Sequence, residues 1–278
     1  MRPSSSALLL VFAAACGAPA GPEAGTTDQA STAATSPDRA VLLRLAYSTV
    51  ECAGGDCSAG TIQHTHYSLL LENLAYDKQV SIHLTSPDGA TSDVAAHYVR
   101  STGDGREVGA ADRDYSSFRG EAPRDLAFDV RFGENGRLHV DDDGGRGYAI
   151  GQNAWATLSL DDVLLESASL DSRQAQMTLA LYVKNLAYQK ALTVVYTTDH
   201  WATTRTAAAH YTGATLSFGG APIANPDAAG VERWIATVPV SAQGPLEFAI
   251  AYDVNGATRW DNDFHRNYVV PPGGTLSN

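Results

Sequence analysis

A tryptophan in polar surroundings is the residue of this chain best suited to hold a ligand. Trp260 is followed directly by Asp261 and Asn262, and Asn267 comes shortly after. A core tryptophan normally has apolar neighbours, since removal of apolar surface from water drives its burial. An exposed indole can instead stack on a flat apolar face of a ligand, while carboxylate and amide groups hydrogen-bond its polar rim. We therefore expect a ligand-binding surface at Trp260, with Asp261 among its polar groups.

The elements that must position this tryptophan are the two arms of a hairpin within residues 246–270. Phe248, Ile250 and Tyr252 alternate with other residues on the first arm, and Asn255-Gly256 follows it. Asn-Gly after an alternating apolar run is a strong signal for a tight β-hairpin turn. Trp260 is thus predicted on the returning arm.

The chain contains two related copies of one unit. Four blocks of the first half recur in the same order in the second half, and the last pair aligns without a gap. The pairs are 41–43 with 163–165, 73–76 with 185–188, 95–98 with 208–211, and 126–150 with 246–270. Ordered recurrence of this kind indicates duplication. We expect one copy at 39–151 and the other at 155–275.

Short strands separated by Gly, Pro, Asn and Asp fill each copy. In the second copy they are predicted at 177–183, 191–197, 234–240, 246–254 and 268–270. Many short alternating strands in a unit of this size favour an antiparallel β-sandwich, so the fold class is all-β with two tandem sandwich domains. Trp234 is expected in a core, and Trp155 is expected to pack between the copies.

The N-terminal residues have the pattern of an export signal. Arg2 precedes an apolar run at 7–15 that is too short to span a bilayer. Residues 13–16 resemble a bacterial lipobox, which would make 1–16 a lipoprotein signal peptide and Cys16 the lipidated residue; a plain secretory signal is the alternative. Residues 17–38 lack large hydrophobic side chains and are expected to form a flexible linker. We expect a lipid-anchored protein of the cell envelope, at the outer membrane or cell surface rather than in the cytoplasm.

Cysteines and charge restrict the other partners. Cys52 and Cys57 form an even pair in an exported chain, which favours a disulfide closing a tight loop. The net charge of -12 without a basic patch argues against nucleic acid, and against a membrane contact other than the lipid anchor.

Metal, cofactor and catalytic sites are not predicted. The acidic run 141–145 lacks EF-hand spacing and is expected to be a solvated turn, and His64 and His66 have no evident third ligand. No nucleophile–base arrangement, phosphate loop or pair of glycosidase carboxylates can be placed. We therefore expect no metal, no cofactor and no enzymatic activity.

The second copy resembles a family-21 carbohydrate-binding module, the starch- and glycogen-binding type. The motifs that carry the resemblance are YVKNLAYQK at 182–190, Asp-x-Trp at 199–201, and LEFAIAYDVNG at 246–256 followed by WDND and NY. The resemblance implies an immunoglobulin-like β-sandwich for each copy and non-catalytic binding of α-1,4-glucans.

The resemblance also implies two ligand surfaces. In the main one, the family's ligand-binding positions correspond to Trp201 and Trp260, with Asn262 and Asn267 beside them. Ala249 stands where the family has a third aromatic residue. In the second surface, the family's positions correspond to Tyr188, Lys190 and Tyr211, and Val231 stands where the family has an aromatic residue beside the tyrosine.

The first copy lacks most of this set. Val140, Asp142 and Gly147 stand where the second copy has Trp260, Asn262 and Asn267, and no tryptophan matches Trp201. Of the family's positions, Tyr76, Lys78 and Tyr98 remain. We expect a degenerate module with at most a tyrosine site at Tyr76.

A glucose ring has an apolar C–H face and a rim of hydroxyls, which suits an indole flanked by amides. The sequence therefore predicts a protein that binds starch, glycogen or maltooligosaccharides at the envelope, and that could act beside a glucan-degrading enzyme. The alternative is an envelope scaffold that binds a protein partner and keeps only a vestigial sugar site.

Overall fold

A computed structural model describes residues 40–52, 60–118, 125–151, 154–218, 221–240 and 244–277. Cys16, the linker 17–38 and Cys57 lie outside these ranges. Cys52 is disulfide-bonded. Within the same ranges, no helix is long and apolar enough to cross a membrane.

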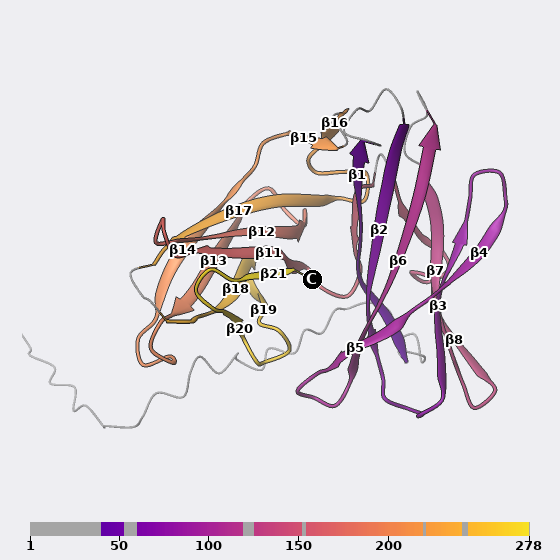
Figure 1. The fold of residues 1–278 in the computed structure, drawn as a ribbon, viewed down its shortest axis with the longest axis horizontal. Helices are drawn as coiled ribbons and strands as arrows, with labels where there is room; N and C mark the ends of the chain where they lie inside the picture. The colour runs from indigo at the N-terminus through magenta and orange to yellow at the C-terminus, as the bar shows by residue number, and fades with distance from the viewer. Residues whose placement is uncertain are drawn as a thin grey trace, which may run out of the picture.

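The first sandwich packs two antiparallel sheets face to face (Figure 1). One sheet has the order β10-β1-β2-β6-β5, formed by β1 (Val41–Cys52), β2 (Gly60–Leu71), β5 (His97–Ser101), β6 (Glu107–Phe118) and β10 (Ala156–Leu158). The other has the order β4-β3-β7-β8, formed by β3 (Lys78–Thr85), β4 (Thr91–Ala95), β7 (Leu126–Glu134) and β8 (Arg137–Asp141), with β9 (Tyr148–Ile150) beside β7.

The second sandwich repeats this order. Its strands are β11 (Val163–Asp171), β12 (Gln176–Lys184), β13 (Lys190–Thr197), β14 (Arg205–Tyr211), β17 (Val231–Pro239), β18 (Leu246–Val254), β19 (Ala257–Asp261), β20 (Tyr268–Val270) and β21 (Thr275–Ser277). A small hairpin of β15 (Thr215–Phe218) and β16 (Ala221–Ala224) is added between β14 and β17. The prediction of two tandem antiparallel sandwiches is confirmed.

The sandwiches differ at the strand that joins their two sheets. In the second, β14 pairs with β13 at one end and with β17 at the other. In the first, the same path is divided at Ala96, so that β4 pairs with β3 and β5 pairs with β6.

The edge strand β10 lies where the two predicted domains meet. Residues 156–158 were predicted within the second copy, but they pair antiparallel with 45–47 of β1. The strand β21 occupies the equivalent edge of the second sandwich, beside β11. The strand β10 therefore pairs with the first sandwich, although it stands at the start of the segment predicted as the second copy.

Alternation along the strands places the cores. On β18, Leu246, Phe248, Ile250 and Tyr252 are all fully buried and point between the sheets. A third apolar cluster joins the two sandwiches and includes Trp155, which is 5% exposed. The expectation that Trp155 packs between the copies is confirmed.

Candidate functional site

Trp201 lies in the loop after β13, and a hydrogen-bond network centred on Asp199 holds this loop. Asp199 accepts hydrogen bonds from the Thr203 N–H at 2.9 Å and the Thr197 hydroxyl at 2.7 Å. The Thr203 backbone bond, followed by the hydroxyl bonds, lowers the pKa of Asp199 to about 2. Trp201 has a φ of 66°, in the left-handed region that residues with side chains rarely adopt. The hydrogen bonds to Asp199 therefore hold the loop in the backbone conformation that positions Trp201.

The indole of Trp201 is fixed over the outer face of β18. Its Nε1–H donates to Glu247 Oε2 at 2.8 Å, and the other carboxylate oxygen of Glu247 lies 2.6 Å from His200 Nδ1. Because Phe248 points into the core, its neighbour Glu247 points to the opposite face of the sheet. The indole consequently sits on the solvent side.

Trp260 lies over the same outer face. The register of β19 pairs Trp260 with Ala251, and it pairs Asp261 with Ile250. Asp261 and Ile250 are buried on the core side, so Trp260 and Ala251 belong to the outward-facing set. The Trp260 side chain is half-buried.

Two indoles thus flank a floor of small residues. Glu247, Ala249 and Ala251 are successive outward-facing positions of β18, and Ala249 and Ala251 are buried. Glu247, which holds Trp201, and Ala251, which pairs with Trp260, are roughly 13 Å apart on a strand that rises about 3.3 Å per residue. The structure brings the two predicted tryptophans onto one surface.

Asn262 and Asn267 close the loop at the edge of this surface. The Asn267 N–H donates to the Asn262 carbonyl at 2.7 Å, and Asn262 Oδ1 accepts from the His265 N–H at 3.0 Å. Both asparagine side chains are half-buried. The bond to His265 uses the amide oxygen of Asn262, so the NH₂ group is the part of that side chain suited to a ligand acceptor.

Asp261 has a different place from the one predicted. Its side chain is 6% exposed, and it accepts from the Leu165 N–H at 2.7 Å and from the Tyr268 hydroxyl at 2.8 Å. Burial is the largest cause that raises the pKa of Asp261 to about 6. The prediction that Asp261 contacts the ligand is therefore corrected: its carboxylate links β11, β19 and β20 inside the fold.

The first sandwich contains the same buried link. Asp141 accepts from the Leu43 N–H at 2.7 Å and from the Tyr148 hydroxyl at 2.9 Å. Beyond it, Asp142 and Asp143 hold a turn through the Gly145 N–H and Arg146. The acidic run is therefore a structural turn, and among the described residues no group of three or more His, Cys, Asp or Glu side chains could hold a metal ion.

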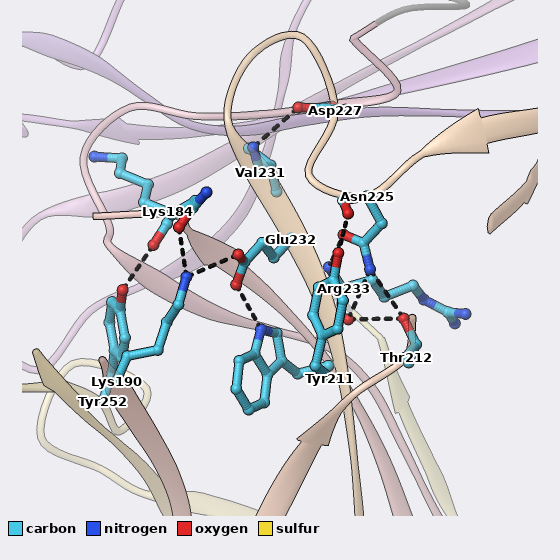
Figure 2. Close-up of polar contacts among 12 residues, drawn as sticks. Lys184, Lys190, Tyr211, Thr212, Asn225, Asp227, Val231, Glu232, Arg233 and Tyr252 are labelled. Atoms are coloured by element: carbon cyan, nitrogen blue, oxygen red, sulfur yellow. Dashed lines mark hydrogen bonds and ion pairs between the residues drawn. The ribbon is translucent and has the colours of Figure 1, made fainter. Parts of the chain in front are cut away.

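The second predicted surface is built around Tyr188 and Tyr211. Tyr188 is 99% exposed, and Tyr211 is partly exposed with its ring centroid 5.9 Å from that of Trp234 in an edge-on arrangement. The Tyr211 hydroxyl donates to the Asn225 carbonyl (Figure 2). Trp234 is only partly buried against the core, so it contributes to this surface as well as to the packing predicted for it.

Lys190 lies beneath that surface, where its ammonium is paired with other side chains and is not exposed. Its ammonium lies 2.7 Å from Glu232 and donates to Asn185 Oδ1 at 2.6 Å (Figure 2). The other oxygen of Glu232 accepts from Trp234 Nε1–H at 2.8 Å. Since the Lys190 side chain is only 6% exposed, its predicted ligand contact is corrected to a role in holding Glu232 and, through it, Trp234.

Sequence reasoning missed Glu232, Glu247 and Asn185 as parts of these surfaces. Glu232 and Glu247 meet their partners across strands that are far apart in sequence, so no local pattern indicates the pairs. Asn185 could have been found, because it stands in both copies of the Asn-Leu-Ala-Tyr block.

The first sandwich has an open groove at its tyrosine site. The groove has a volume of about 580 Å³, and its lining includes Tyr76, Tyr98, Lys78 and Glu107. Tyr76 is fully exposed and Tyr98 is 60% exposed. Lys78 is paired with Glu107 and donates to Asn73 Oδ1 at 3.1 Å, as Lys190 does with its partners.

A glycine opens this groove. Gly109 is the register partner of Tyr98, and Trp234 is the corresponding partner of Tyr211. A Cβ atom on Gly109 would lie 3.0 Å from Leu71 Cδ1 and 3.4 Å from the His97 carbonyl. Leu71, which lines the groove, therefore packs close to Gly109 and leaves no room for a side chain such as the indole at the equivalent position of the second sandwich.

Comparison with known proteins gives one family model that matches part of the chain, residues 157–271. This segment matches the carbohydrate/starch-binding module of family 21. It includes the Trp201–Trp260 face and the Tyr188 surface, whereas the match does not extend over the first sandwich.

Individual known proteins are similar to parts of the chain. Glucoamylase 1 of Rhizopus oryzae is 39% identical over 93 residues, which are 32% of this chain and 13% of the glucoamylase. The solved starch-binding domain of Rhizopus oryzae glucoamylase, in complex with β-cyclodextrin and maltoheptaose, is 32% identical with a TM-score of 0.32, over 40% of this chain and 92% of that one. The carbohydrate-binding module of the muscle glycogen-targeting subunit of Protein Phosphatase-1 is 13% identical with a TM-score of 0.26, over 41% of this chain and 77% of that one. The chain thus spans a small part of the curated relative that it matches.

Proposed function

We propose that this chain binds α-1,4-glucan without catalysis, and that the main contact is the outer face of β18 between Trp201 and Trp260. The observation that carries the proposal is the pair of indoles on one side of one sheet, within the segment that matches a starch-binding module. An enzyme's whole activity does not follow from this match, because the chain covers 13% of the glucoamylase.

The chemistry of the face suits a sugar polymer. Each indole offers a flat apolar surface for the C–H face of a glucose ring, and the Asn262 and Asn267 amides can satisfy hydroxyls that would be costly to leave unpaired. Ala249 and Ala251 lie between the two rings but are buried, so contact with a glucan is confined to the exposed parts of the indoles and to the amides. Shallow contact of this kind predicts dissociation constants on the order of micromolar to millimolar.

Two tyrosine surfaces would supplement the main face. We infer that the first sandwich is a diverged copy of the same module, because its strand order and its buried Asp141 link repeat those of the second. The exposed rings of Tyr188 and Tyr76 could then hold other segments of the same polymer. Several weak sites on one chain raise the overall affinity through effective concentration.

The cellular setting is also proposed. The export signal and the lipobox-like sequence ending at Cys16 support a lipid anchor at the cell envelope. A protein held there could retain glucan near a glucan-degrading enzyme.

Native gel electrophoresis in the presence of starch or glycogen tests the proposal. The full chain should be retarded, and Trp201→Ala combined with Trp260→Ala should remove most of the retardation. The matched control is Val140→Ala, since Val140 holds the register position of Trp260 in the first sandwich and is 39% exposed. Absence of retardation for the unaltered chain in both polymers would overturn the proposed function.

A further inference from the structure

The loop between β19 and β20, residues 262–267, docks onto the first sandwich (Figure 1). The Phe264 ring lies beneath three guanidinium groups of that sandwich, with its centroid 4.6 Å from Arg44, 5.7 Å from Arg100 and 5.9 Å from Arg106. Cations over an aromatic face attract it electrostatically. One phenyl ring thus joins this loop to β1, β5 and the loop before β6.

Polar contacts surround the ring. Arg100 pairs with Asp263, and Arg266 donates to the Ser101 carbonyl. Gly103 allows the close approach, because a Cβ atom there would lie 3.3 Å from the Phe264 carbonyl oxygen. The docked loop is the one that carries Asn262 and Asn267.

The backbone of the loop has a conformation that the docking must maintain. Phe264 and His265 have φ values of 55° and 68°, whereas the first sandwich has Gly144 and Gly145 at the equivalent positions, with φ values of 68° and 88°. A residue with a side chain is disfavoured in this region, because its Cβ atom comes too close to the following carbonyl oxygen. The second sandwich therefore carries a strained loop where glycine would relieve the strain, and the Phe264 contacts offset that cost.

The docking point lies at the rim of the first sandwich's groove. Ser101, which receives Arg266, is the register partner of Glu107, and Glu107 lines the groove. The Tyr98 hydroxyl lies 3.0 Å from Ser101 Oγ. Ser101 thus links the groove to the loop at the end of the tryptophan face, because it contacts Tyr98 on one side and Arg266 on the other.

We propose that the Tyr76–Tyr98 groove of the first sandwich and the Trp201–Trp260 face of the second form one composite site for a single α-glucan chain. The docked loop fixes the spacing of the two parts. This inference rests on the proposed function and deepens it. A glucan too short to span the groove and the tryptophan face would bind each of them separately, whereas a long glucan would occupy both.

Calorimetric titration separates these cases. The full chain carrying Tyr188→Ala serves as the reference. This substitution removes the Tyr188 surface at a side chain that is 99% exposed. Long maltooligosaccharide is expected to bind with a stoichiometry of one chain per protein. Tyr76→Ala and Trp260→Ala should each weaken it about tenfold without changing that stoichiometry. Two long chains per protein, with one lost in each variant, would overturn the composite site.

A loop variant provides the second arm. Phe264→Gly suits the left-handed backbone and removes the arginine contacts, so it should weaken long maltooligosaccharide several-fold and leave maltotriose within about twofold. Arg146→Ala in the undocked loop of the first sandwich is the matched control and should change neither. Equal effects of Phe264→Gly on both ligands would contradict the inference, whereas failure of the reference protein to bind either ligand would overturn the proposed function itself.

Discussion

Neighbouring residues on β19 have opposite roles because a strand alternates its faces. Trp260 lies over the outer face, while Asp261 turns inward and receives hydrogen bonds from β11 and from Tyr268. A buried carboxylate is tolerated only when its oxygens are satisfied. Asp261 therefore stabilises the fold, whereas Trp260 forms part of its surface.

The raised pKa of Asp261 predicts a pH effect on stability. Its pKa moves from 3.8 to about 6 on folding, so the folded state binds more protons than the unfolded state between these values. The stabilisation is complete below about pH 4 and is lost as the pH rises through about 6. A gap of about two pKa units corresponds to about 3 kcal/mol in the free energy of unfolding.

Chemical denaturation of the unaltered chain and of Asp261→Asn at pH 4.5 and pH 7 measures this contribution. Asp261→Asn should be less stable at both values, since an NH₂ group replaces one of the two oxygens that receive the Leu165 N–H and the Tyr268 hydroxyl, and an NH₂ group cannot accept a hydrogen bond. The difference in unfolding free energy should be larger at pH 4.5 than at pH 7. A difference that grows toward pH 7 would contradict the account.

Residue types were predictable from the sequence, but residue roles were less so. A tryptophan among polar side chains indicated a surface, and the structure brings Trp201 and Trp260 together. The roles of Asp261 and Lys190 could not be predicted, because both depend on burial and on partners that are distant in sequence.

At the scale of elements, the two sandwiches differ in the loop that carries Trp201 in the second sandwich. The loop after β13 presents Trp201 and is tied by Asp199, whereas the corresponding loop after β3 is a short turn in which Asp88 accepts from the Ala90 N–H at 3.0 Å. The strands beneath are alike. The loop therefore accounts for Trp201, whereas the second tryptophan depends on a single strand position, which is Trp260 on β19 and Val140 on β8.

Loosening this loop should weaken glucan binding without unfolding the sandwich. Asp199→Ala removes the bonds to Thr203 and Thr197 that hold the loop, so Trp201 loses its fixed position. We expect a several-fold weaker dissociation constant for maltooligosaccharide, with a melting temperature shifted by only a few degrees. Asp88→Ala is the matched control in the first sandwich, and an equal loss of affinity in both variants would refute the role given to the loop.

The strands themselves were predictable to within a few residues from apolar alternation, as on β18. The pairing of 156–158 with β1 could not be predicted, because so short a segment has no pattern of its own and takes its pairing from the free edge of β1.

At the scale of the whole molecule, the two sandwiches form one body through an apolar cluster and a docked loop. Trp155 packs against Tyr182 with ring centroids 5.4 Å apart, and its carbonyl accepts from the Ser48 N–H at 2.9 Å. Arg44 adds a buried ion pair with Asp161. The sequence predicted two domains with Trp155 between them, but the docked loop could not be predicted, since Arg44 and Phe264 meet only in the folded chain.

The interface predicts cooperative unfolding. Differential scanning calorimetry of the unaltered chain should give a single transition, and Trp155→Ala should separate it into two while costing about 3–5 kcal/mol. Val140→Ala, at an exposed position of the first sandwich, should leave the single transition in place. Two transitions in the unaltered chain would show that the sandwiches unfold independently.

The central claim is that glucan binds over Trp201 and Trp260, and the indole N–H signals in a nitrogen-edited NMR spectrum test it most directly. The chain has four tryptophans, of which Trp155 is buried between the sandwiches. Addition of maltooligosaccharide should move the Trp201 and Trp260 signals in proportion to occupancy and leave that of Trp155 in place. Saturating ligand that moves neither the Trp201 nor the Trp260 signal would contradict the account.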